Sequence, residues 1–246
     1  MSESVKIISP IDGSVYAERP IASDAEIGAA LSAARAALPE WRRVPVAERG
    51  RYMLAFLDAL LAMNDDIAME LAWQMGRPVR YGGEKGGVEE RIRAMVVLAE
   101  EALKPYTPPA KDGFRRYIAR EPVGIVMVIA PWNYPYLTAI NTIVPGLLAG
   151  NAIVLKHAAQ TLLVGERIAE AFRRARLPKG LFANLVLSHE QTERLIGSGK
   201  IDHIRMAEVI GGELVEMGQV RFGGGGSCEQ RWTRSATRST RCRRKR

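Results

Sequence analysis

The residues best suited to chemistry lie in a turn bracketed by two prolines, Pro131-Trp-Asn-Tyr-Pro135, directly after an apolar run that ends near Ile129. The asparagine in this turn, Asn133, carries an amide that donates two hydrogen bonds without changing charge. Such a group can stabilise a developing oxyanion. The alternative is that Asn133 caps the helix that follows it. Local chemistry alone favours the capping role.

A lysine, Lys156, ends the next apolar run, which covers residues 152–155. If that run is a strand, the ammonium group lies at its carboxyl end and can meet a ribose or phosphate oxygen of a ligand. The alternative is a solvated lysine at a strand end. Single polar residues at strand ends are common, so the sequence around Lys156 does not by itself identify a site.

The elements that must position these residues form a repeating pattern after residue 120. The apolar runs at residues 123–129 and 152–155 are typical of strands buried on both faces, and residues 181–187 form a third candidate. Helical stripes at residues 137–148 and 164–175 separate them. This alternation predicts an α/β fold with a Rossmann-like, doubly wound parallel sheet, which binds ligands at the carboxyl ends of its strands.

The first hundred residues have a different pattern. Residues 5–8 and 14–17 flank a turn and predict a hairpin. Ser23 and Glu26 have the spacing of a capping box, after which apolar residues recur at helical spacing up to about residue 104. Alternation in residues 114–119 predicts a half-exposed strand. A mostly helical segment is therefore expected to precede the sheet.

Taken together, three segments resemble the signatures of the aldehyde dehydrogenase superfamily. They are Glu121-Pro-Val-Gly124, the turn from Ile129 to Pro135, and the stretch from Pro145 to Lys156. The resemblance extends from the hairpin to about His203 and includes Met75-Gly-Arg-Pro78.

This resemblance implies an NAD(P)-binding domain, a separate catalytic domain and a small β-extension used for oligomerisation. Asn133 would be the oxyanion donor, and the coenzyme would be NAD or NADP. The residues lining the coenzyme site would be Ile129, Pro131, Trp132 and Lys156. The partners would be a small aldehyde and further copies of the chain.

The sequence also departs from the family pattern. After the lysine, the family has a proline and then a glutamate that binds the adenosine ribose, whereas this chain has His157 and Ala159. We interpret His157 as a packing or solvent residue and not as a catalytic base. The family's Phe-Thr-Gly-Ser turn is replaced by residues 206–209, which places a close backbone approach to the coenzyme in doubt.

The nucleophilic cysteine and the general-base glutamate of the family are predicted to be absent. Cys228 and Glu216 come too soon after residue 209 to fill those roles. We therefore expect the N-terminal, coenzyme-binding portion of such an enzyme, truncated before its nucleophile. Residues 1–204 would be this domain, with a helical lead-in at 1–104 and a sheet core at 114–204. Residues 205–222 would be a degenerate continuation.

The net positive charge of the chain lies at its C-terminal end. Of the 35 lysines and arginines, eight lie in residues 231–246 with no acidic residue, so the remainder carries 27 cations and 27 anions. Residues 223–246 are predicted to be a disordered basic tail. The sequence has no apolar run long enough to span a membrane and no secretory signal, which predicts a cytoplasmic protein. No metal site is expected.

Two functions therefore stay open. The first is NAD(P)-dependent oxidation of an aldehyde to a carboxylic acid. The second is a catalytically inactive fragment that binds coenzyme or associates with related chains. Binding of nucleic acid through the tail is a weaker third possibility, and no sequence-specific nucleic-acid partner is expected.

Overall fold

The computed structural model describes residues 3–210 and 213–220. The predicted basic tail at 223–246, Cys228 and Cys242 lie outside the described residues. In chain order, the elements are β1 Ser4–Ile8, β2 Val15–Pro20, α1 Asp24–Arg43, α2 Val46–Leu61, α3 Asn64–Met75, η1 Val79–Tyr81, α4 Lys85–Leu103, β3 Ile125–Ala130, α5 Pro135–Leu148, β4 Ala152–His157, η2 Ala159–Thr161, α6 Leu162–Arg174, β5 Phe182–Asn184, α7 His189–Gly197, β6 His203–Ile210 and β7 Glu213–Val220.

The N-terminal predictions are confirmed. β1 and β2 form an antiparallel hairpin. α1 begins with the predicted capping box, in which the Ser23 hydroxyl accepts from the Glu26 N–H and the Glu26 carboxylate accepts from the Ser23 N–H. Both free N–H groups are therefore satisfied, which fixes where the helix starts.

The main sheet has the strand order β5-β4-β3-β6-β7. The first four strands are parallel, and β7 is antiparallel to β6. The third predicted strand is shorter than expected, with three residues instead of seven. Past residue 204, where the sequence lost its clear pattern, β6 continues to Ile210, and its first four residues pair with β3. The backbone of β6 pairs with β3 and β7, and this pairing stabilises a strand that the side-chain pattern does not indicate.

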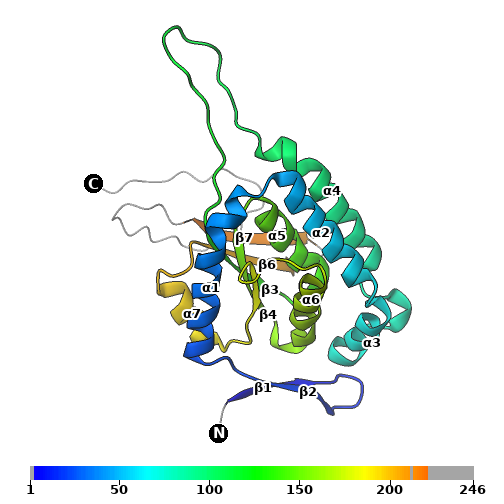
Figure 1. The fold of residues 1–246 in the computed structure, drawn as a ribbon. Helices are drawn as coiled ribbons and strands as arrows, with labels where there is room; N and C mark the ends of the chain where they lie inside the picture. Colours follow the sequence, from blue (N-terminus) through cyan, green and yellow to red (C-terminus); the bar gives the residue numbers. More distant parts are fainter. Residues whose placement is uncertain (1–2, 211–212, 221–246) are drawn as a thin grey trace.

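Helices cover both faces of this sheet (Figure 1). The crossovers through α5 and α6 run in the same direction along the sheet, so both helices lie on one face, with α2 and α4 outside them. α1 packs on the other face beside α7, and Arg194 of α7 bonds Asp24 of α1 at 3.0 Å. The predicted doubly wound α/β fold is confirmed.

The core between α2, α6 and the sheet is centred on three aromatic rings. Phe172 stacks on Phe56 with ring centroids 4.0 Å apart and meets Phe182 at 4.8 Å. At the end of α1, Trp41 is buried, meets Tyr52 of α2 edge-on at 5.6 Å, and donates its indole N–H to the Leu147 carbonyl of α5 at 3.0 Å. These contacts tie the helical lead-in to the sheet.

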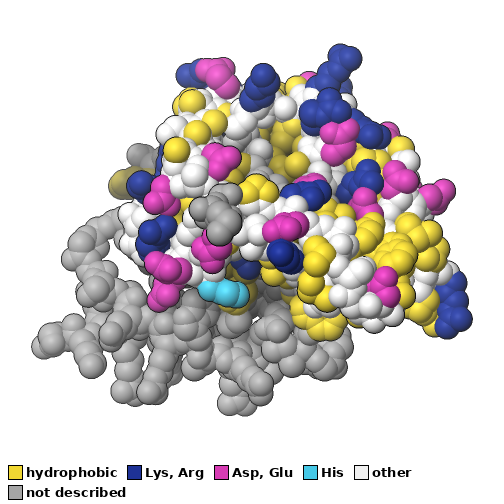
Figure 2. All heavy atoms as spheres, turned by 90° about the horizontal axis from the view of Figure 1, so that it is seen from below, with side chains coloured by type: hydrophobic (Ala, Val, Ile, Leu, Met, Phe, Trp, Pro, Cys, Tyr) yellow, Lys and Arg dark blue, Asp and Glu magenta, His cyan; other side chains and the backbone are white. Residues whose placement is uncertain are grey.

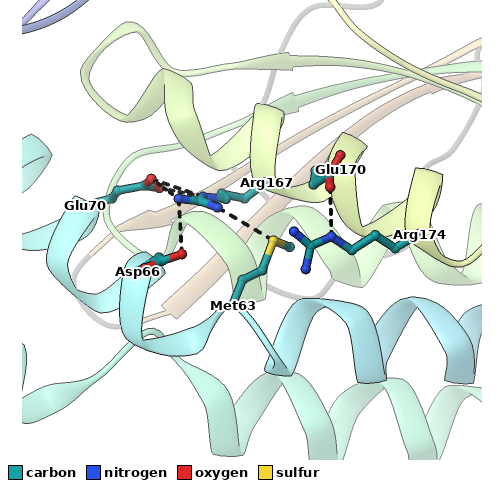
Figure 3. A network of polar contacts seen from close by, with 6 residues as sticks. All are labelled: Met63, Asp66, Glu70, Arg167, Glu170 and Arg174. Carbon is teal, nitrogen blue, oxygen red and sulfur yellow. Dashed lines mark hydrogen bonds and ion pairs between the residues drawn. The ribbon is translucent and has the colours of Figure 1, made fainter.

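A polar network fastens α3 to α6 (Figure 3). Arg167 of α6 donates to both carboxylate oxygens of Glu70 from its Nε at 3.0 and 3.1 Å and lies 3.7 Å from Asp66. One residue earlier in α6, Glu166 binds Arg19 of the hairpin at 2.6 Å. α6 therefore holds both the third helix and the hairpin by ion pairs.

The predicted half-exposed strand at residues 114–119 is wrong. Residues 104–124 form an extended arm that leaves the body of the molecule and returns (Figure 1). Within the arm, isolated bridges join Tyr106 to Ile118 and Lys111 to Phe114, and both faces of residues 114–119 are exposed. Alternation indicates a strand where a neighbouring strand covers one face, and the described residues supply no such neighbour here.

Two features are absent from the described part of the chain. None of its helices combines the length and the apolar character that crossing a membrane requires. No three His, Cys, Asp or Glu side chains in these residues are grouped so that they could hold a metal ion.

We predict that Phe172→Ala lowers the free energy of unfolding by about 3–5 kcal/mol, because it leaves a cavity between two other aromatic rings. Phe114→Ala is the matched control, since Phe114 is 64% exposed in the arm and its loss should change stability by less than about 0.5 kcal/mol. Urea unfolding followed by circular dichroism measures both. Equal losses in the two variants would contradict this assignment of the core.

Candidate coenzyme site

The predicted site residues gather at the carboxyl edge of the sheet. The parallel register pairs Ile129 of β3 with Lys156 of β4, and Ala130 with His157. The chain continues from β3 toward β5 on one side and returns to β6 on the other, so the end of β3 is the topological switch point. Open α/β sheets bind ligands at such points.

The turn after β3 presents its aromatic residues to solvent. Trp132 is 49% exposed and Tyr134 is 48% exposed, whereas Pro135 is buried at the start of α5. The amide oxygen of Asn133 accepts from the Tyr134 N–H at 3.1 Å. Its carbonyl accepts from Arg77 Nη2 at 3.0 Å. The amide oxygen of Asn133 thus points toward the backbone N–H of Tyr134.

Asn133 does not cap α5 in the usual way. The N-cap residue of this helix is Tyr134, which makes no capping bond through its side chain. The side chain that serves the helix is Glu84, whose carboxylate accepts from the Leu137 N–H at 2.7 Å. Asn133 is therefore not the N-cap residue of α5.

Glu84 forms a buried ion pair with Arg77 at 2.6 Å, and the two side chains are 6% and 14% exposed. Burial raises the pKa of the Glu84 carboxyl, while the Leu137 N–H and the Arg77 guanidinium oppose that shift. Arg77 lies inside the family motif at residues 75–78, but no role was expected for Arg77 or Glu84. Glu84 and Leu137 are 53 residues apart in the sequence, so no local spacing indicated their contact.

Lys156 is 9% exposed, so its side-chain stem packs within the protein at the end of β4. Burial lowers the pKa of its ammonium group. Within the described residues its Nζ has no hydrogen-bond or ion-pair partner among the contacts that the structure records. Because Nζ is not among the fully buried polar atoms, the ammonium group is accessible at the end of β4, where it can bind a ligand that offers oxygen atoms.

His157 is a buried packing residue, which agrees with one of the two roles expected for it. Its Nε2 lies 3.3 Å from the Pro135 carbonyl, and its Nδ1 lies 3.2 Å from the Thr161 hydroxyl. Since a carbonyl can only accept, Nε2 carries the proton and Nδ1 accepts from Thr161. Burial lowers the pKa of the ring to about 4. His157 therefore links the end of β4 to the start of α5 as a neutral ring.

The two remaining departures from the family pattern lie at the same edge. Ala159 begins η2 and is exposed, so no carboxylate stands where the resemblance implies one for the ribose. Met206 lies opposite Ile129 in the regular strand β6. In this backbone, residues 206–209 thus continue a strand and do not form a turn.

The hairpin lies against the carboxyl edge. β1 contacts η2, and Ile7 packs with Leu162 and Leu163 at the start of α6. Figure 2 shows the molecule from the hairpin side, where Lys and Arg side chains lie together at the upper right and both charge types are otherwise scattered among hydrophobic side chains.

The comparisons with known proteins agree with this geometry. The family model described as "Aldehyde dehydrogenase family" matches residues 1–213, and the chain therefore belongs to that family. The match extends beyond His203, where the resemblance in the sequence was expected to end, and includes β6.

Curated relatives are similar over most of the chain. An N-succinylglutamate 5-semialdehyde dehydrogenase of Caulobacter vibrioides is 31% identical over 79% of this chain and 41% of its own length. A phenylacetaldehyde dehydrogenase of Pseudomonas fluorescens is 30% identical over 89% of this chain and 44% of its own. The chain thus spans about two fifths of the length of these relatives.

Solved structures are similar to this chain over most of its length as well. PnpE in complex with nicotinamide adenine dinucleotide has a TM-score of 0.77 at 27% identity, over 83% of this chain and 42% of that one. An NAD-dependent benzaldehyde dehydrogenase from Corynebacterium glutamicum has a TM-score of 0.76 at 26% identity, with coverage of 83% and 45%.

We predict that His157 makes the protein less stable as the pH falls from 6.5 to 4. The unfolded histidine takes up its proton near pH 6.5, whereas the folded ring stays neutral to about pH 4. The unfolded state therefore binds more protons in this window. Stability is complete above pH 6.5 and falls by about 2 kcal/mol by pH 5.

Urea unfolding at pH 7.5 and pH 5 measures this loss, and His157→Gln is the control, because its amide can make both hydrogen bonds without titrating. Wild type should lose more stability than this variant between the two pH values. Equal losses would show that other groups cause the pH dependence.

Proposed function

We propose that this chain is the coenzyme-binding portion of an NAD(P)-dependent enzyme that oxidises an aldehyde to a carboxylic acid. The observation that carries the proposal is the juxtaposition of the Asn133 turn and the buried Lys156 on adjacent parallel strands at the switch point. Membership of the family supports the same reaction class. The names of the relatives differ in their aldehyde, so we propose no single substrate.

Each predicted site residue has a role in this proposal. Lys156 would donate to ribose oxygens of the coenzyme, since its side-chain stem is buried and its Nζ, which is not among the fully buried polar atoms, makes no ion pair in the described residues. Ile129, Pro131 and the exposed Trp132 would line the coenzyme site at the end of β3. Bound NAD(P)⁺ would supply the hydride acceptor.

Asn133 would donate its amide N–H to the aldehyde oxygen. The negative charge that develops on that oxygen during attack is best stabilised by a donor held in place beforehand. The Tyr134 N–H donates to the amide oxygen of Asn133 at 3.1 Å, which restrains the orientation of the amide. Asn133 is therefore suited to the oxyanion role that the family resemblance implies.

A second candidate, coenzyme binding without turnover, is favoured for these 246 residues by one observation. The sequence contains two cysteines, Cys228 and Cys242, and Cys228 comes too soon after residue 209 to match the family's nucleophile. A thiolate must be positioned to attack the aldehyde. The described part of the chain holds no such group.

Association with further copies is also proposed. The arm at residues 104–124 exposes Tyr106, Phe114, Tyr117 and Ile118, each by more than half. Such exposure of large apolar side chains is typical of an interaction surface. It supports the expected homo-oligomer, which light scattering of the purified chain would test.

We predict weak discrimination between NAD and NADP, because Ala159 neither accepts from the ribose hydroxyls nor repels a 2′-phosphate. Dissociation constants measured by isothermal titration should agree within about tenfold, which corresponds to about 1.4 kcal/mol. Ala159→Glu should shift the preference toward NAD. Gln160→Glu is the matched control, since it adds the same charge one residue further along. A strong preference for NAD in the wild type would contradict the prediction.

We predict that the purified chain produces no NAD(P)H from a panel of aliphatic, aromatic and carboxylated aldehydes. Cys228 comes too soon after residue 209 to stand where the family has its nucleophile, so we expect no thiolate positioned to attack the carbonyl. Absorbance at the wavelength of the reduced coenzyme measures turnover. Robust turnover that disappears in Cys228→Ala would show that a working nucleophile is present after all.

A further inference from the structure

We propose that the ion pair of Arg77 and Glu84 holds Asn133 in one orientation. The start of α5 and the Asn133 amide could each bind an anion, and in this proposal the Glu84 carboxylate occupies the first and leaves the second for the oxyanion. The proposal rests on the proposed function of Asn133 as an oxyanion donor. Arg77 and Glu84 are positioning residues, because they act through Asn133 and α5 and not on the substrate.

The first part of the argument concerns α5. The free N–H groups and the dipole at the start of a helix attract an anion. Here the Glu84 carboxylate occupies that place, with the Leu137 N–H donating to it at 2.7 Å. An oxyanion formed beside the turn is therefore not drawn to the helix start, and the Asn133 amide remains the donor for it.

The second part concerns the turn itself. Arg77 uses one side of its guanidinium for Glu84 at 2.6 Å and donates from Nη2 to the Asn133 carbonyl at 3.0 Å. Its guanidinium also lies 5.6 Å from the centre of the Tyr134 ring. The planar fork of arginine allows these contacts at once, which a lysine cannot reproduce.

The third part concerns the backbone of Glu84, which has a φ of +65°. Side chains other than glycine rarely adopt this region and incur strain there. Two glycines, Gly82 and Gly83, precede this residue, and glycine would adopt such a φ without strain. A carboxylate at a strained position is consistent with a side chain that is needed for its contacts.

The experiment uses the full chain labelled with ¹⁵N-asparagine. The sequence has five asparagines, and Asn133→Ala assigns the resonances of Asn133. ¹⁵N relaxation of its side-chain amide reports whether that amide has one orientation. We expect an order parameter typical of rigid groups in the wild type and a value below about 0.6 in Arg77→Met. Arg77→Lys should give an intermediate value.

Glu84→Gln is a second variant that keeps the shape of the side chain. Its amide can still accept from the Leu137 N–H but no longer holds the Arg77 guanidinium, so α5 should persist while the Asn133 amide becomes mobile. This variant tests the proposal even if Arg77→Met does not fold.

Arg35→Met is the matched control. Arg35 pairs with Asp202 at 2.5 Å, and Asp202 accepts from the Ile125 N–H at 2.7 Å, so this pair has the same design at the start of β3. Its loss should lower stability without changing the order of the Asn133 amide. If Glu84→Gln and Arg77→Lys leave that amide as rigid as in the wild type, or if Arg35→Met loosens it equally, the proposal is overturned.

Titration of the wild type with NADPH separates this proposal from the proposed function. Failure to bind the coenzyme, together with the expected order parameters, would overturn the coenzyme function and leave the positioning by Arg77 and Glu84 intact. Coenzyme binding together with unchanged order parameters in the variants would overturn the positioning by Arg77 and Glu84 and leave the coenzyme function intact.

Discussion

The parallel register between β3 and its two neighbours is the constraint on which the rest of the structure depends. Because Ile129 lies opposite both Lys156 and Met206, the loops that leave β3 and β4 start at one edge of the sheet, beside the middle of β6. Parallel strands require helical crossovers, and α5 and α6 supply them on one face. The same crossovers bury β3 and β4 and bring the start of α5 beside the turn that carries Asn133. Core packing and the candidate site are therefore consequences of one arrangement.

Burial of polar groups distinguishes this edge from the rest of the sheet. His157 is neutral and makes two hydrogen bonds, so its burial is compensated within the protein. Glu84 is compensated by Arg77 and by the N–H groups of α5. Lys156 differs from both, because its stem is buried while its ammonium group, which is not among the fully buried polar atoms, has no hydrogen-bond or ion-pair partner in the described residues. A site that binds an oxygen-rich ligand has use for such a cation, whereas a purely structural site does not.

The departures from the family pattern change the site without changing the fold. A histidine in place of the family's proline adds a link between β4 and α5 that a proline, which has no side-chain donor, would lack. An alanine in place of the ribose-binding glutamate removes a charge from an exposed position and leaves η2 in place. Substitutions at loop positions of a rigid sheet alter recognition in this way, since the strands and helices are set by buried residues.

The amino-acid sequence by itself determined the hairpin, the capping box of α1, the buried strands β3 and β4 and the order in which strands and helices alternate, because these follow from local periodicity and local hydrogen bonding. It also placed Asn133 and Lys156 at strand ends. It did not determine the arm at residues 104–124 or the pairing of β6, since alternation does not say whether a neighbouring strand is present. Only the tertiary structure decided that Lys156 is buried and that Arg77 and Glu84 meet the start of α5. Those contacts join residues more than fifty positions apart, and their energies depend on burial, which no local pattern contains.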